Sequence, residues 1–95
     1  MVSVDEELKA AKAAKAAIGA LLTTARKSEV LTTFMKARGT AVLNLSSGGD
    51  LNVARGNVGI ALSSVLHSRP TQEKIDKTKV AINDWIRELE ASAAA

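Results

Sequence analysis

The 95-residue sequence has no cysteine and no tyrosine, and it has a single proline, phenylalanine, tryptophan and histidine. The lack of cysteine excludes disulfides, thiolate nucleophiles and thiolate metal ligands. No uncharged stretch reaches the roughly 18 residues that a transmembrane helix needs. Packing and hydrogen bonds alone must therefore hold the fold together, and we expect no membrane-spanning segment.

Large apolar side chains are also scarce, because 17 of the apolar residues are alanine and the aromatic content is only 2%. A core built from this set must be aliphatic and closely spaced. A domain of this size buries a smaller fraction of its surface than a larger domain does, and this one has no disulfide to compensate. The composition therefore indicates a marginal isolated monomer and predicts a homo-oligomer or a protein partner.

Charge of one sign does not dominate, since 13 Lys and Arg against 10 Asp and Glu give a net charge of +3. This mild excess differs from the dense positive field of a dedicated nucleic-acid arm. The chain begins with acidic residues at Asp5, Glu6 and Glu7, where a signal or transit peptide would be basic. We expect a cytoplasmic origin, which is compatible with residence in an assembled particle.

Helical periodicity runs through most of the sequence. Ser3 and Glu6 have the spacing of a capping box before an Ala-rich and Lys-rich stretch. Apolar residues then recur at the three- and four-residue spacing of amphipathic helices. The pattern predicts helices over residues 4–26, 29–38, 51–67 and 71–91. We expect an all-α, compact bundle of three to four helices in a single domain that spans 1–95.

The segments between these helices carry breaking signals. Gly39 predicts the end of the second helix, and residues 40–45 predict an extended or irregular connector. Residues 46–49 are Ser-Ser-Gly-Gly, which predicts a flexible loop. The Ala-rich tail at 92–95 is expected to fray. An alternative keeps the first two helices continuous as one helix over 4–38.

The third predicted helix has two apolar sides, because Val53 and Ile60 lie opposite its main apolar stripe. Gly56 and Gly59 interrupt it, each at a cost of about 1 kcal/mol relative to alanine. A helix of this kind is typical of a central position between two neighbours. We expect one neighbour to approach closely at Gly56.

No arrangement of residues predicts catalysis. His67 is placed at a helix C-terminus, where a positive charge is favoured, and no strand-turn-helix nucleophile motif accompanies the nearby serines. Asp5, Glu6 and Glu7 are interpreted as solvated first-turn acids, because no loop with converging oxygens for a cation exists. The sequence therefore predicts no catalytic residue, no metal site and no cofactor.

The fourth predicted helix has the cleanest apolar stripe, and the first has a stripe of small residues that favours tight packing. We predict a protein interface through both stripes, formed by Ile75, Ile82, Trp85, Ile86, Leu89, Ala11, Ala14 and Ile18. Trp85 is the central anchor, because tryptophan combines a large apolar area with a low entropy cost. The other interpretation, in which Trp85 closes the intramolecular core, stays open at this point.

These patterns favour a non-enzymatic structural or interaction protein that self-associates or packs into a larger assembly, such as a component of a viral or phage particle or an assembly factor. The alternative is a small basic nucleic-acid-binding protein. Its phosphate contacts would come from the cations of the first helix and its end, Lys9, Lys12, Lys15, Arg26 and Lys27. Membrane-surface binding is disfavoured, because the first helix lacks large apolar anchors.

Overall fold

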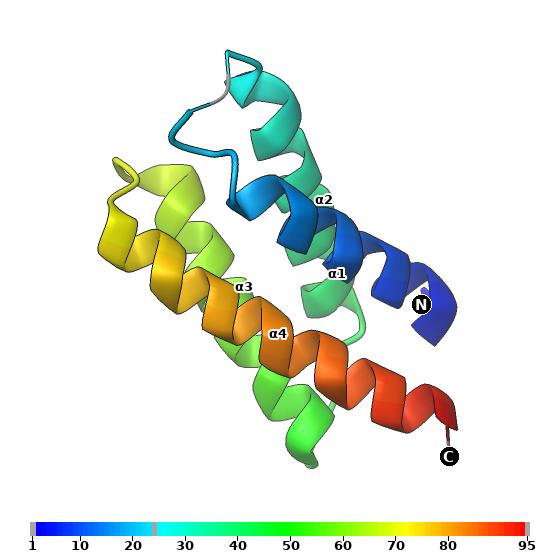
Figure 1. The fold of residues 1–95 in the computed structure, drawn as a ribbon. Coiled ribbons are helices and arrows are strands. Elements are labelled where there is room, and N and C mark those ends of the chain that lie inside the picture. Colours follow the sequence, from blue (N-terminus) through cyan, green and yellow to red (C-terminus); the bar gives the residue numbers. More distant parts are fainter. Residues whose placement is uncertain (1, 24, 95) are drawn as a thin grey trace.

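The computed structural model describes residues 2–23 and 25–94, and within these ranges it contains four helices and no strand. The helices are α1 (Val4–Ile18), α2 (Lys27–Leu43), α3 (Asp50–His67) and α4 (Gln72–Ala94). Each helix packs against the next, and α4 returns to pack against α1 (Figure 1). The result is a four-helix bundle of 39 × 20 × 19 Å, which confirms the all-α prediction.

Helix α1 begins as the sequence predicts but ends earlier. The Ser3 hydroxyl accepts a hydrogen bond from the Glu6 backbone N–H at 3.2 Å, and Gly19 is the C-cap residue. The chain then runs through tight turns, in which the Leu21 N–H donates to the Ile18 carbonyl at 3.4 Å. The predicted end at residue 26 and the continuous helix over 4–38 are both wrong. A continuous helix would direct the next apolar set away from the core, whereas the turns bury Leu21.

Helix α2 is longer than the sequence predicts. It passes through Gly39 and ends at Leu43, so the extended connector predicted for residues 40–45 is wrong. The reason is burial, because Ala41 continues the fully buried stripe of Phe34 and Ala37 at helical spacing. The turn that follows contains two glycines with positive φ, Gly48 at 81° and Gly49 at 86°, a conformation that glycine adopts without strain.

The last two helices lie close to their predicted bounds. Helix α3 begins one residue earlier than predicted, and α4 begins one residue later. The tail predicted to fray from residue 92 is helical up to Ala94. Met1, Thr24 and Ala95 lie outside the described residues, so the predictions that include them are tested only around them.

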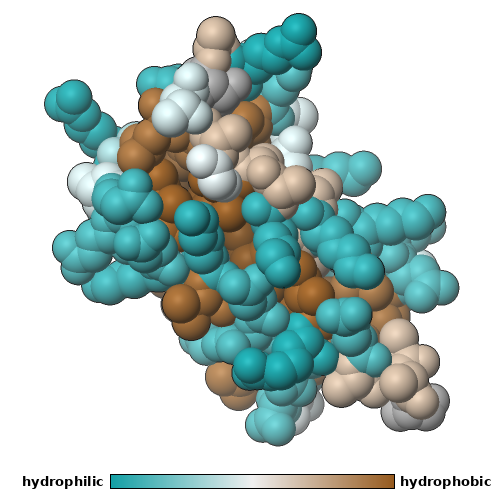
Figure 2. Space-filling view, in the orientation of Figure 1, coloured by the Kyte–Doolittle hydropathy of each residue, from teal (hydrophilic) through white to brown (hydrophobic). Residues whose placement is uncertain are grey.

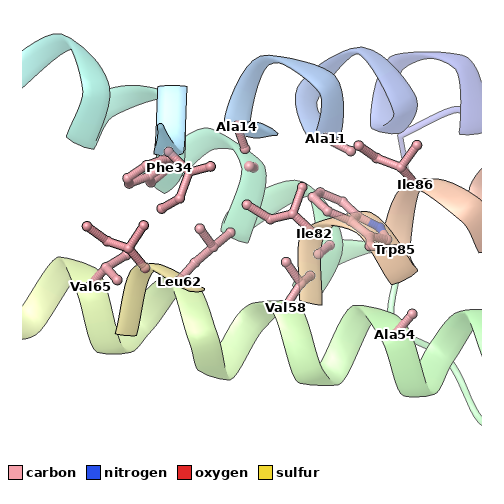
Figure 3. Packing of buried hydrophobic residues seen from close by; sticks show 14 of the residues in the cluster. Ala11, Ala14, Phe34, Ala54, Val58, Leu62, Val65, Ile82, Trp85 and Ile86 are labelled. Carbon is pink, nitrogen blue, oxygen red and sulfur yellow. The ribbon is translucent and has the colours of Figure 1, made fainter. Parts of the chain in front are cut away.

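The core lies along the axis of the bundle and draws on all four helices. Figure 3 shows Ile82 and Trp85 of α4 pointing into the space between α1 and α3, with Phe34 of α2 further along. Helix α1 contributes the fully buried Ala11 and Ala14 at this level. Their small size lets the backbone of α1 come close to the large side chains of α4, as the sequence predicts.

Candidate functional site

A buried carboxylate occupies one end of the core. Glu7 of α1 has no exposed surface, and the guanidinium of Arg55 from α3 forms a bidentate ion pair with its carboxylate. Arg55 Nε lies 2.8 Å from Oε2 and Nη2 lies 2.7 Å from Oε1. Trp85 Nε1 of α4 donates to Oε2 at 2.8 Å, and Asn44 Nδ2 donates to Oε1 at 2.8 Å. Each carboxylate oxygen thus accepts two hydrogen bonds.

The network continues beyond the carboxylate. Arg55 Nη1 donates to the Asn44 carbonyl at 3.1 Å and to Asn52 Oδ1 at 3.2 Å. The Asn44 side chain accepts from the Val2 N–H at 3.0 Å and donates to the Val2 carbonyl at 2.9 Å. One polar cluster therefore connects the N-terminal segment, the C-cap of α2, and helices α1, α3 and α4. We name it the Glu7 network.

Both carboxylate oxygens of Glu7 are already occupied by hydrogen bonds within the chain. Among the described residues, no buried side-chain nitrogen or oxygen lacks a hydrogen-bond partner. A carboxylate whose four bonds are all internal cannot serve as a general base without losing one of them. Buried ion pairs of this kind are attested mainly as devices that fix a unique packing register. The geometry therefore favours a structural role for Glu7 and Arg55.

The electrostatics of Glu7 follow from the same contacts. Burial raises the pKa of its carboxyl group, because desolvation disfavours the charged form. Hydrogen bonds from Arg55, Asn44 and Trp85, with the positive charge of Arg55, outweigh burial and hold the pKa below its ordinary value of 4.5. Glu7 is thus ionised in the folded chain at neutral pH.

Glu7 is expected to make the fold sensitive to acid. Because its pKa is lower in the folded chain than in the unfolded chain, its contribution to stability is present above pH 4.5 and is lost as the pH falls through the folded pKa. Urea unfolding followed by Trp85 fluorescence, at several pH values between neutral and strongly acidic, measures this loss.

The matched variants for the acid experiment are Glu7→Gln and Glu6→Gln. Glu7→Gln removes the ionisable group, so its free energy of unfolding should depend less steeply on pH than that of the wild type. Glu6 is an exposed neighbour, and its replacement should leave the slope unchanged. Equal slopes for the wild type and Glu7→Gln would contradict the assignment of the acid loss to Glu7.

The prediction that Glu7 is a solvated first-turn acid is therefore wrong. The sequence did contain a signal, because Glu7 precedes the buried residues Ala11, Ala14 and Ile18 at spacings of four, seven and eleven. Arg55 sits in the same way on the buried stripe of α3. A charged residue on each of two apolar stripes indicates a buried pair, although spacing alone does not reveal that the two residues meet.

The residues predicted to form an interface lie inside the chain. All of them are at most 7% exposed: Ala11, Ala14, Ile18, Ile75, Ile82, Trp85, Ile86 and Leu89. The helices of the same chain cover these side chains, so they offer almost no surface to a partner on the folded molecule. For Trp85 the core interpretation is the one that the structure supports, because its ring is fully buried and its N–H is bound to Glu7.

The cations of the alternative interpretation remain on the surface. Lys9, Lys12 and Lys15 are exposed along α1, and Arg26 and Lys27 are exposed at the start of α2. Lys9 borders a hollow between α1 and α2, whereas Lys15 borders one between α1 and α4. Figure 2 shows the α1 and α4 side, where hydrophilic side chains flank an apolar seam.

An apolar groove runs between α2 and α3 on the outside of the bundle. Its volume is about 810 Å³. Apolar and small residues line most of it, with a few polar ones: Arg38, Gly39, Val42, Leu43, Leu45, Arg55, Gly56, Gly59, Ile60 and Ser63. We call this surface the α2–α3 groove. The sequence pattern identifies Ile60 and Gly56, but it predicts that a neighbouring helix covers this side.

The predicted close neighbour at Gly56 is absent from the described part of the chain. A Cβ atom at Gly56 would meet nothing within 4 Å, and Val53 and Ile60 are 62% and 74% exposed. Helix α3 packs on α2 and α4 with its other side. The second apolar side that the sequence indicates is real, but nothing in the described chain covers it.

The remaining candidates are plain surface features. His67 ends α3 as predicted, and its Nε2 lies 3.2 Å from Arg38 Nη1. Across the described residues, no group of three or more potential metal ligands comes together, and no helix has the length and apolar character to cross a membrane.

No protein-family model, curated protein or solved structure matches the chain.

Proposed function

We propose that this chain is a non-enzymatic interaction protein that enters a larger assembly through the α2–α3 groove. The observation that carries the proposal is the concentration of exposed apolar side chains. Of the eight large apolar residues that are exposed within 2–23 and 25–94, six come from α2, α3 and the loop between them: Met35, Val42, Leu43, Leu45, Val53 and Ile60. Four of these six, Val42, Leu43, Leu45 and Ile60, line the α2–α3 groove together, and a patch of exposed apolar side chains on a small domain marks an interaction site.

The charge pattern of α3 supports the same proposal. Arg55 is the only charged residue between positions 51 and 66, and it is buried against Glu7. The solvent-facing side of α3 therefore offers no charged side chain over four turns, whereas the exposed side of α1 carries Lys9, Lys12 and Lys15. An uncharged helix side is typical of a surface that another protein covers.

Photo-crosslinking in the source cells tests the proposal. A photoreactive phenylalanine analogue at position 60 should yield a covalent adduct of defined mass, because Ile60 is the most exposed large apolar residue in the described part of the chain. The same analogue at position 80 on α4 is the matched control, since Val80 is 61% exposed but lies outside the groove. Excess wild-type protein should suppress the adduct, and an Ile60→Asp competitor should not.

Two results would count against the proposal. Equal labelling from positions 60 and 80, or none from either, would mean that the groove is no contact surface. Co-purification of nucleic acid at low salt, lost when Lys9, Lys12 and Lys15 are changed to glutamine, would favour the nucleic-acid alternative, because phosphate contacts weaken steeply as salt rises.

A further inference from the structure

We propose that the occupant of the α2–α3 groove is the same groove of a second copy of this chain, related by a two-fold axis with the α2 helices antiparallel. This inference rests on the proposed function and names its partner. In a two-fold contact the same patch meets itself, so the patch must carry both the projections and the hollows that receive them.

The groove has both kinds of feature. Ile60 and Leu43 project from it, being 74% and 60% exposed. Gly39 and Gly56 leave its floor open, because a Cβ atom at either position would meet nothing within 4 Å. Small residues on facing helices allow two backbones to approach closely. A rotated second copy can therefore place its projecting side chains over the glycines of the first.

Charge also favours the antiparallel copy. Arg38 is the one solvent-accessible cation of the groove lining, and its Nη1 reaches Ser63 at 3.3 Å and His67 at the C-terminal end of α3. The opposite end of the groove is at Leu45, just beyond α2, whose last turn has no basic residue. The two-fold rotation brings each Arg38 to the C-terminal end of the other α2, where the helix dipole favours a cation.

The area required is within reach of this face. A stable interface buries about 800 Å² on each partner. That is about one seventh of the 5630 Å² that the chain exposes, and a lateral side of the 39 × 20 × 19 Å bundle is of this order. No acidic side chain lines the groove, so a strongly basic partner gains nothing there, and the mainly apolar groove of a second copy is the better match.

Sedimentation of the purified chain over a wide concentration range tests the inference. We expect a reversible dimer that persists at high salt, because the contact is apolar. Ile60→Asp should raise the dimer dissociation constant at least about tenfold, as expected for a central anchor. Val80→Asp, equally polar and on α4, should leave it unchanged. Circular dichroism should show native helix content in both variants.

A crosslinking trap checks the geometry of the dimer, and the absence of cysteine makes it clean. Gly56→Cys should be joined to its symmetry mate by a short bis-maleimide, and Val80→Cys should not. The inference is overturned if the chain stays monomeric at every concentration and Gly56→Cys does not crosslink. A molecular mass that keeps rising with concentration would mean open-ended association and would overturn the two-fold symmetry. If position 60 still forms an adduct with a different protein in cells, the proposed function stands while the second copy is excluded.

Discussion

Replacing Arg55 by methionine is expected to destabilise the chain by about 3 to 5 kcal/mol, because Glu7 then keeps its buried position without its partner. The stability of a domain is about 5 to 15 kcal/mol, and small domains lie at the low end. Arg55→Met should therefore leave a large unfolded fraction at room temperature. Thermal melting followed by circular dichroism measures the change.

Two further variants separate the buried charge from the loss of contacts. Glu7→Gln combined with Arg55→Met removes the unpaired charge and should be more stable than Arg55→Met alone. Arg87→Met breaks the exposed pair with Asp84, whose Nη2–Oδ1 distance is 2.9 Å, and should cost no more than about 1 kcal/mol. If Arg55→Met costs as little as Arg87→Met, the Glu7 network does not hold the helices in register.

The sequence predicted the helices best where a single buried stripe decides their position. Helix α4 has one buried stripe, and its predicted bounds agree closely with the structure. Helix α2 was predicted too short, because the glycine at position 39 is a local stop signal that the burial of Ala41 overrides. The end of α1 was missed although Gly19 is a local stop signal there, because Leu21 and Leu22 continue the apolar pattern beyond it.

The candidate site was harder to predict than the fold. Periodicity identifies which residues face inward, but it does not say which stripes meet, so Glu7 and Arg55 could not be paired across 48 positions of sequence. The same limit led to the prediction of an interface through Trp85, because a buried stripe looks alike whether its cover comes from the same chain or another. The exposed side of α3 was visible in the sequence as the second stripe of Val53 and Ile60.

Replacing Trp85 by alanine is expected to unfold the chain instead of only dissociating an oligomer. The loss of a large buried aromatic side chain costs about 3 to 5 kcal/mol. The change also removes the indole N–H that donates to Glu7 Oε2 at 2.8 Å, which leaves a buried carboxylate with three donors instead of four. Circular dichroism and light scattering on the same samples should show helix content and compact size lost together.

Trp85→Phe and Ile60→Asp complete this experiment. Trp85→Phe keeps most of the ring volume and loses only the donor, so it should cost about 1 to 3 kcal/mol and still fold. Ile60→Asp should show the reverse of Trp85→Ala, with native helix content and weaker association, because residue 60 is 74% exposed. If Trp85 is a core residue, its removal should unfold the bundle that covers it. Trp85→Ala could instead keep native helix content and lose the oligomer. That result would contradict the core interpretation and place the interface on α4.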